Sequence, residues 1–402
     1  MNLLIATTSF PDKNNDDIAG RFVLSEAMAY ALNGINVTVL TPHQPGALPR
    51  EVIRPQVEVV RFRYFLPARI QCLKTPNKPM YGQRSLLTAV QLPFFLVIFF
   101  LQLIKYGLKA DIIHCQWTAT ALLALPCKWL FKKKIVMTVR GSDIRLLPRF
   151  LNLFIHAQVD AVIDCYGDSI NNNRNKRNFP AHYIKLPLIV ELPVSTLPEM
   201  PGDMRAPIAV EPEIFKVVYL GRFDRVKIEA GLPILELIDA ADIISREHDY
   251  RFHIFYIGGG DAAIMADMQQ RVDALDLNHC ITFLGPKNKV NDYLTFCDLG
   301  VGGIAFNAVS QEFACLKKPQ LMFAGNHNLE TPWKDKVNNL FFRARDVRGL
   351  ADAMVYAMED RKRLAKVGTE AHRMMRGYVK DLQDGGADYR EAFFKIVNKG
   401  KC

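Results

Sequence analysis

Two cations that follow a short apolar run are the most informative residues of this chain. Residues 215–220 predict a buried strand, and Arg222 and Lys227 stand just after Gly221, in a loop that leads into a helix. A guanidinium binds phosphate oxygens in a fork, an ammonium acts as a point charge, and fixed cations stabilise the charge that develops on a departing diphosphate. Arg222 and Lys227 are therefore our catalytic candidates, with two exposed loop cations of no special role as the alternative.

A glycine run closes the next predicted strand. Residues 253–257 are mostly apolar, and Gly258, Gly259 and Gly260 follow them. Glycine lets a ligand come close to the backbone, so Gly259 is a candidate substrate contact, and a structural turn explains the run equally well. The spacing differs from the dinucleotide-binding pattern Gly-X-Gly-X-X-Gly.

Glu312 is the candidate acid of this half of the chain. It lies seven residues before Pro319, in a segment that predicts a helix after a strand. A carboxylate placed there accepts hydrogen bonds from both hydroxyls of a ribose. The alternative is a glutamate at a helix N-terminus, which the helix dipole stabilises.

Two glycine-containing turns in the first half are the remaining substrate-binding candidates. Arg140, Gly141 and Asp143 follow a predicted strand at 135–138, where a backbone amide and a carboxylate can meet a substrate, although Asp143 also suits a helix cap. Gly20 precedes a predicted helix, where it either brings backbone N–H groups to a phosphate or serves as an ordinary turn residue.

Strands and helices alternate along most of the chain, which predicts an α/β fold of two Rossmann-like, doubly wound domains that face each other across a cleft. The predicted strands are residues 3–8, 36–41, 57–62, 110–115, 134–138, 159–164, 215–220, 252–257, 281–284, 299–304 and 320–323. The predicted helices are residues 22–32, 119–131, 232–247, 262–275, 290–297, 348–358 and 361–378.

A proline-rich segment interrupts this alternation. Five prolines and a glycine lie between residues 192 and 212, and such a composition is typical of a linker between domains. We therefore expect a first domain at 1–195, a linker at 196–212, a second domain at 213–380 and a final helical segment at 381–402.

The charge balance indicates an anionic partner. The 402 residues include 51 Lys and Arg against 41 Asp and Glu, a formal net charge of +10. Nucleotide phosphates and an anionic membrane fit this surplus, as does a solvated basic surface without a partner. We expect no nucleic-acid partner, because helix-turn-helix, zinc-ligand and aromatic-basic strand patterns are missing.

Metal and redox motifs are also missing from the sequence. There is no Asp-X-Asp pair, no His-Glu-X-X-His and no His/Cys cluster, so we expect neither a metal nor another cofactor. The eight cysteines lack Cys-X-X-Cys spacing and lie mostly in apolar runs, and the first residues do not form a secretory signal. Both features predict a cytoplasmic protein.

Residues 86–104 form the one membrane-like stretch. Its uninterrupted apolar core covers only residues 92–101, whereas a span needs about 20 apolar residues. Basic and aromatic residues around it favour contact with an anionic membrane surface without crossing it. The basic residues include Arg61, Arg63, Arg69, Lys105 and Lys109. A buried core helix and a true span are the alternatives.

Taken in order, these motifs resemble the retaining nucleotide-sugar glycosyltransferases of family 4, which have the GT-B fold. The resemblance covers nearly the whole chain. It is carried by residues 10–11 with 20–23, 34–42, 111–114, 138–143, Gly221-Arg222 with Lys227, 258–261, 283–285, 312–319 and 338–346.

The resemblance implies transfer of a sugar from a nucleotide diphosphate donor to a hydroxyl of a lipid-linked or polysaccharide precursor, with retention of the anomeric configuration. Arg222 and Lys227 would hold the diphosphate and Glu312 the ribose. The first domain would bind the acceptor, the second the nucleotide sugar, and the final helix would return to the first domain. We expect a cytoplasmic enzyme in peripheral contact with the inner face of the plasma membrane.

Several positions depart from the family pattern. The family usually has two glutamates with seven residues between them; the second matches Glu312, but the first falls on Ile304, which cannot hydrogen-bond a sugar hydroxyl. His is common where Arg140 stands, and the glycine that usually follows Lys227 directly comes only at Gly231. A GT-B-shaped binding subunit without catalysis is therefore the alternative function. A sugar-nucleotide epimerase is a third reading.

Overall fold

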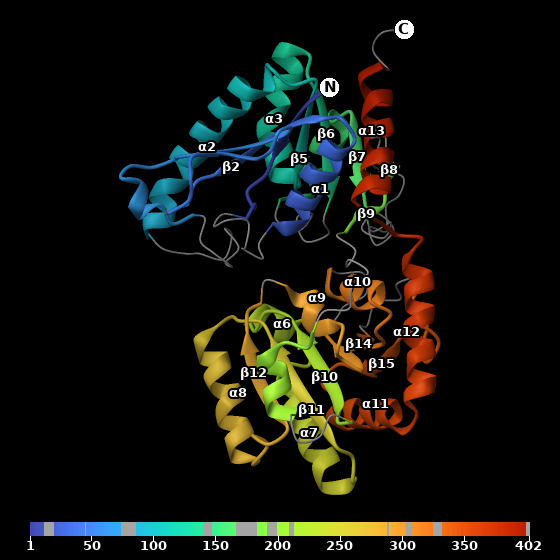
Figure 1. Cartoon of the computed structure of the whole chain (residues 1–402). Coiled ribbons are helices and arrows are strands. Elements are labelled where there is room, and N and C mark those ends of the chain that lie inside the picture. The colour runs from blue at the N-terminus through green and yellow to red at the C-terminus, as the bar shows by residue number, and fades with distance from the viewer. Residues whose placement is uncertain are drawn as a thin grey trace. The chain divides into compact units, whose positions relative to one another are not determined.

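The chain folds into two compact units in the computed structural model (Figure 1). The structure describes residues 1–398 except 12–19, 45, 74–85, 140–146, 166–182, 191–198, 209–212, 288, 303–307 and 325–331. Unit 1 comprises residues 1–191 and 378–402, and unit 2 comprises residues 192–377. Each unit is a largely parallel sheet with helices packed on both faces, which confirms the predicted α/β class.

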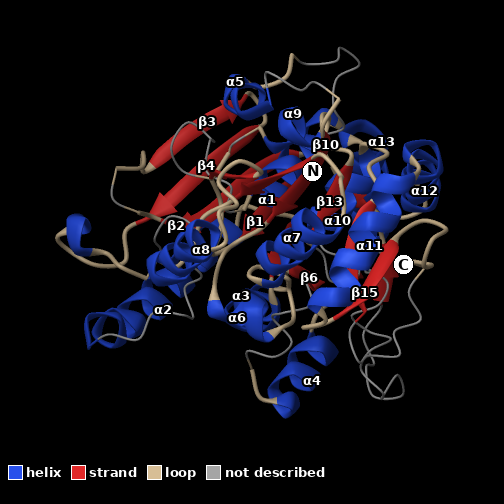
Figure 2. Ribbon diagram, turned by 90° about the horizontal axis from the view of Figure 1, so that it is seen from below, coloured by secondary structure: helices blue, strands red, loops and turns tan. Residues whose placement is uncertain are grey.

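Unit 1 is built on an eight-stranded sheet in the order β3-β4-β2-β1-β5-β6-β7-β8. All its pairs are parallel except β3 with β4, which lie side by side at one edge (Figure 2). The central strands β1, β5 and β6 are almost wholly buried, as expected for strands covered on both faces. The strands are β1 (Asn2–Ala6), β2 (Asn36–Pro42), β3 (Arg50–Arg54), β4 (Val57–Phe62), β5 (Ile112–Gln116), β6 (Lys134–Val139), β7 (Ala161–Asp164) and β8 (Tyr183–Lys185).

The helices of unit 1 divide between the two faces of this sheet. On one face, α2 (Leu86–Gly107), α3 (Thr118–Phe131) and α4 (Arg149–Gln158) share a single apolar core with the strands. On the other, α1 (Arg21–Leu32) packs against the C-terminal helix α13 (Leu382–Asn398), with the ring of Tyr30 5.3 Å from that of Tyr389. The short strands β9 (Leu188–Ile189) and β16 (Val379–Lys380) pair beside them.

Unit 2 is built on a six-stranded parallel sheet in the order β12-β11-β10-β13-β14-β15. The strands are β10 (Phe215–Leu220), β11 (Phe252–Ile257), β12 (Ile281–Gly285), β13 (Leu299–Val301), β14 (Gln320–Ala324) and β15 (Leu340–Arg343). The helices are α5 (Gly202–Arg205), α6 (Arg225–Glu229), α7 (Glu236–Glu247), α8 (Ala262–Ala274), α9 (Val290–Leu294), α10 (Ala308–Cys315), α11 (Val347–Glu359) and α12 (Arg361–Met375).

Part of the segment expected to be a linker packs as an element of unit 2. Residues 202–208 form α5 and a 3-10 turn, and Met204 and Ile208 are buried in one of the two apolar cores of this unit. Apolar side chains spaced four residues apart override the local proline content here, because their burial stabilises the helical turn.

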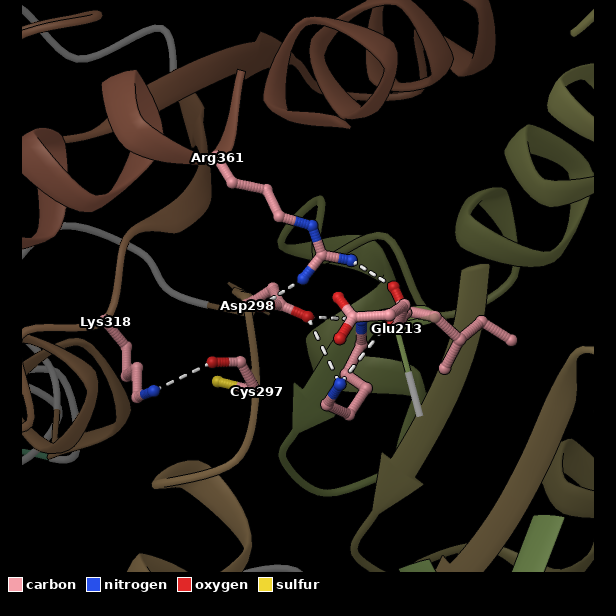
Figure 3. A network of polar contacts seen from close by, with 7 residues as sticks. Glu213, Cys297, Asp298, Lys318 and Arg361 are labelled. Atoms are coloured by element: carbon pink, nitrogen blue, oxygen red, sulfur yellow. Dashed lines mark hydrogen bonds and ion pairs between the residues drawn. The ribbon is translucent and has the colours of Figure 1, made fainter. Parts of the chain in front are cut away.

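A polar network fastens α12 to the amino-terminal edge of this sheet (Figure 3). Asp298, just before β13, accepts the backbone N–H of Lys216 at 2.8 Å and pairs with the guanidinium of Arg361 at 3.0 Å. Arg361 also donates to the carbonyl of Glu213 at 2.7 Å. These bonds lie at the edge of the sheet opposite to the one where the strands end in loops.

Candidate functional site

The candidate site of unit 2 lies where its parallel strands end. Leu220 pairs with Ile257 and Tyr219 with Val301, so the loops after β10, β11 and β13 leave the sheet at one edge. Carboxyl ends of parallel strands are where ligands bind in open α/β sheets. The sequence candidates Arg222, Lys227 and Gly259 all belong to these loops or to the helix that follows.

The loops after β10 and β11 are joined by backbone hydrogen bonds. Phe223 donates its N–H to the carbonyl of Gly259 at 3.1 Å, and its own carbonyl accepts the N–H of Asp261 at 2.8 Å. The Phe223 ring is buried against Tyr219 and Tyr256, with centroids 5.8 and 6.0 Å away. Arg222 is therefore held on a loop whose backbone is fixed on both sides.

The three glycines of the β11 loop have different surroundings. A Cβ on Gly258, whose φ is 148°, would lie 1.8 Å from the carbonyl oxygen of Gly221, and one on Gly260 would lie 2.0 Å from that of Phe223. A Cβ on Gly259 would meet nothing nearer than Pro286, at 3.7 Å. Gly258 and Gly260 are thus required by the contact between the loops, whereas Gly259 has room for a Cβ at an ordinary contact distance from Pro286.

Lys227 lies on the short helix α6 rather than on the expected loop. Asp224 explains the difference, because its Oδ1 accepts the backbone N–H of Lys227 at 2.8 Å and its carbonyl oxygen accepts the same N–H at 3.0 Å. These bonds cap the first turn of the helix. The sequence contains this signal, an aspartate three residues before the lysine, which the loop interpretation missed.

Arg222 and Lys227 lie close enough to influence each other electrostatically. Burial lowers the pKa of the Lys227 ammonium, the positive charge of Arg222 lowers it further, and Asp224 opposes both effects. The Arg222 guanidinium is 48% exposed and has Asp224 at 3.6 Å. Among the described residues, the Lys227 ammonium has no ion pair. Two neighbouring cations with one carboxylate between them form a site suited to an anion.

Glu312 occupies the second turn of α10, a helix that packs against β13. Glu312 is half-buried. The ring of the next residue, Phe313, lies against Gly300, the middle residue of β13. Glu312 is the fifth residue of α10, so the explanation by a helix N-terminal position loses support. Burial and, secondly, the Glu312 carboxylate raise the pKa of Cys315 to about 12, which places the carboxylate near this thiol.

Of the unit 1 candidates, the structure describes Gly20. Gly20 caps α1 with φ 82°, and a Cβ there would lie 2.6 Å from the backbone of Ser9, so a turn requirement alone accounts for the glycine. Arg140, Gly141 and Asp143 lie outside the described residues. The strand that precedes them, β6, ends at Val139, one residue later than predicted.

Trp117 is a notable residue of unit 1 that sequence patterns did not single out. It follows β5 with φ 72° and ψ 152°, a conformation that is essentially restricted to glycine, and its ring packs edge-on against Phe22 at 6.0 Å. The Thr120 hydroxyl holds it by donating to the Trp117 carbonyl at 2.8 Å. Only the backbone angles reveal this strain.

No known family profile matches the chain, and no curated protein sequence matches it. Solved structures do. Sucrose-phosphate synthase from Thermosynechococcus elongatus is 17% identical, with a TM-score of 0.74 over 99% of this chain and 100% of that one. HepE of Anabaena, in complex with UDP and glucose, is 15% identical, with a TM-score of 0.69 over 98% and 100%.

The trehalose-6-phosphate synthase OtsA is also similar, at 11% identity, with a TM-score of 0.68 over 98% of this chain and 99% of that one. These glycosyltransferases confirm the predicted GT-B fold. At such low identity the likeness establishes the fold alone, and the reaction has to be argued from the site.

Proposed function

We propose that the protein is a retaining, nucleotide-sugar-dependent glycosyltransferase of the family 4 type, which glycosylates a hydroxyl of a lipid-linked or polysaccharide precursor. The observation that carries the proposal is the Arg222–Lys227 pair at the carboxyl edge of the unit 2 sheet. There the Lys227 side chain is half-buried, and burial and then the charge of Arg222 lower the pKa of its ammonium. The UDP and UDP-glucose complexes of HepE support it by analogy of fold.

The chemistry assigned to these residues is stabilisation of the leaving diphosphate. As the bond between sugar and diphosphate breaks, negative charge grows on the phosphate oxygens, and the preorganised guanidinium and ammonium lower the energy of that state. Both cations act without a metal, and the proposal needs none. Glu312 holds the ribose hydroxyls, and the donor approaches the backbone at Gly259, where no side chain intervenes.

On the acceptor side, the proposal uses the carboxyl edge of the unit 1 sheet. Gly20, Arg140, Gly141 and Asp143 are the residues that the family resemblance assigns to this side. Ile304 replaces the first motif glutamate, so we assign the sugar ring contacts to other groups. Retention is inferred from the family and is tested by the anomeric configuration of the product, read by NMR.

Acceptor-dependent release of a nucleoside diphosphate tests the reaction. The purified protein is incubated with a panel of UDP- and GDP-sugars, with and without lipid-linked saccharides, and we expect release of UDP or GDP to require an acceptor. Nucleotide binding without release from any donor would favour the alternative, a binding subunit without catalysis. Turnover of the donor without an acceptor would favour an epimerase.

We further propose that α2 places the enzyme on an anionic membrane surface from the cytoplasmic side. Its inner face is core, since Phe95 and Phe99 are buried and Phe99 stacks on Phe62 at 4.9 Å. By length and composition α2 could cross a membrane, and 28% of its most apolar window is buried. Because crossing would pull these rings out of the unit 1 core, we assign α2 a position along the surface.

The opposite face of α2 is apolar and uncovered within unit 1. We call it the outer stripe; its members recur at intervals of three or four residues, which places them on one side of a helix. Phe94 and Val97, at its centre, are 54% and 56% exposed. The outer stripe consists of Leu86, Val90, Phe94, Val97 and Leu101.

Charge favours an anionic bilayer as the partner of the outer stripe. Residues 59–142 contain thirteen Lys and Arg against one acidic residue, Asp111. Arg63, Arg69, Lys105 and Lys109 are exposed, whereas Arg61, expected among them, is buried and paired with Glu51 at 2.8 Å. Apolar side chains flanked by cations bind the headgroup region of anionic leaflets.

Replacing Phe94 and Val97 together by Glu is expected to weaken vesicle binding at least about tenfold, because two half-exposed apolar side chains lose about 1.4 kcal/mol or more of burial. The measurement is flotation with vesicles containing phosphatidylglycerol, compared with neutral phosphatidylcholine vesicles. Val337→Glu, at a 51% exposed apolar residue of unit 2, is the matched control. Equal flotation of the double variant would contradict the proposal. It would also be contradicted if the unchanged protein proved dimeric in solution and the double variant monomeric, because a second copy would then cover the stripe.

A further inference from the structure

Asp224 contacts the Arg222 guanidinium and the backbone of Lys227 through different oxygens. Its Oδ2 lies 3.6 Å from the Arg222 guanidinium, and its Oδ1 accepts the backbone N–H of Lys227 at 2.8 Å. The Asp224 carbonyl accepts the N–H groups of Lys227 and Ile228 at 3.0 and 3.2 Å. Because α6 holds Asp224 through these bonds, its carboxylate stays in place even when the Arg222 side chain turns away.

We propose that Asp224 competes with the diphosphate for Arg222 and thereby limits how tightly the site holds a nucleotide. The inference rests on the proposed function and adds a positioning residue to it. In the free protein the Asp224 carboxylate pairs with the Arg222 guanidinium. In the complex the diphosphate pairs with Arg222 instead, and its negative charge is repelled by that of Asp224.

The geometry supports exchange rather than a permanent pair. A separation of 3.6 Å exceeds the 2.7–2.9 Å that is typical of charge-assisted hydrogen bonds, and ion pairs exposed to solvent are weak. A diphosphate offers the guanidinium several oxygens and more negative charge than one carboxylate. A competing carboxylate that stays in place then speeds the departure of the diphosphate product, a step that often limits turnover.

The substitution Asp224→Asn separates this role from capping. Asparagine caps helices as well as aspartate does, so its side-chain oxygen can still accept the Lys227 N–H, while the charge is removed. We expect the dissociation constants of inorganic pyrophosphate and of UDP, measured by calorimetry, to fall about threefold, which corresponds to about 0.7 kcal/mol. A purely structural role predicts the opposite sign, because a loosened loop weakens binding.

Glu247→Gln supplies the matched control. This change removes one negative charge from an exposed pair with Arg348 on α7 and α11, and it is expected to leave both dissociation constants unchanged. In an Arg222→Ala background, the gain from Asp224→Asn should shrink, since the two residues act on one another. The proposed competition would be refuted if Asp224→Asn increased affinity equally with and without Arg222, or if Glu247→Gln gave the same increase.

The same titrations separate this inference from the proposed function. If Arg222→Ala leaves pyrophosphate and UDP binding unchanged, the diphosphate site itself is refuted. If Arg222→Ala weakens binding but Asp224→Asn also weakens it or has no effect, the competition alone is refuted.

The pH dependence of binding gives a second readout. The charged groups that act on the Lys227 ammonium are Arg222 and Asp224, and Asp224 is the one that raises its pKa. Removing the Asp224 charge leaves the pKa of Lys227 lower, and diphosphate binding requires the protonated ammonium. Pyrophosphate affinity in the Asn variant should therefore be lost at a lower pH than in the unchanged protein. If affinity is lost at the same alkaline pH in Asp224→Asn and in the unchanged protein, the proposed role of the Asp224 charge is refuted.

Discussion

Arg222→Ala is expected to lower turnover about 10²–10³-fold at saturating donor, the range found when one preorganised donor to a developing negative charge is removed. The fold should tolerate the change. Arg222 is 48% exposed, and its one described partner, Asp224, lies at the long distance of 3.6 Å. An ion pair of this kind contributes about 0–1 kcal/mol, so the melting temperature should fall by only a few degrees. Initial rates and calorimetry on the same preparation measure the two effects.

Arg225→Ala is the control for this substitution. Arg225 is exposed, lies three residues further along and carries the same charge, but it is not among the groups that act on the Lys227 pKa. We expect its loss to leave turnover nearly unchanged. Arg222→Lys should retain part of the activity, because it keeps the charge and loses the fork. Equal rates for Arg222→Ala and the unchanged protein would remove this residue from the mechanism.

The residual activity of Arg222→Ala should also shift along the pH axis. Arg222 lowers the pKa of Lys227 in the folded protein, so its removal raises that pKa. The ammonium then stays protonated to a higher pH, and the alkaline limb of the residual rate should move upward. This direction is opposite to that expected for Asp224→Asn, so the pair of variants checks the arrangement of all three charges.

The sequence predicted the central strands better than the edges of the sheets. The bounds of β4, β10 and β11 were predicted to the residue, because β-branched and aromatic residues, which favour strands, predominate in each of them. β3 was missed: it is an antiparallel edge strand with alternating charges, and Val52 in its centre is largely exposed. β8 and β15 are also edge strands and were also missed, since an edge strand needs less apolar sequence.

The sequence located the candidate cations but not the arrangement around them. A glycine after a buried strand was enough to identify Arg222 and Lys227. The helix under Lys227 and the competing carboxylate of Asp224 depend on hydrogen bonds of a single turn. Gly258 and Gly260 are needed where the β11 loop contacts a loop more than thirty residues earlier in the chain, and Gly259 is not. No local sequence pattern predicts this difference.

Gly258→Ala is expected to lower the free energy of unfolding by about 3 kcal/mol, the largest effect we expect on stability. The new methyl group would lie 1.8 Å from the carbonyl oxygen of Gly221, a backbone atom that cannot turn aside, and alanine is strained at the φ of 148° found there. The loop that carries Arg222 must therefore move away from the β11 loop. Urea unfolding followed by circular dichroism measures the loss, and turnover should fall with it.

Gly259→Ala is the matched test, since it adds the same methyl group one residue along the chain. There is room for this methyl group, whose nearest neighbour would be Pro286 at the ordinary contact distance of 3.7 Å, so the free energy of unfolding should change by no more than about 0.5 kcal/mol. If the donor occupies that space, the same variant should nevertheless raise the KM for the nucleotide sugar. Stability lost at 258 and donor affinity lost at 259 would separate the structural glycine from the substrate-facing one. Equal destabilisation by both variants would mean that the whole run is only a turn.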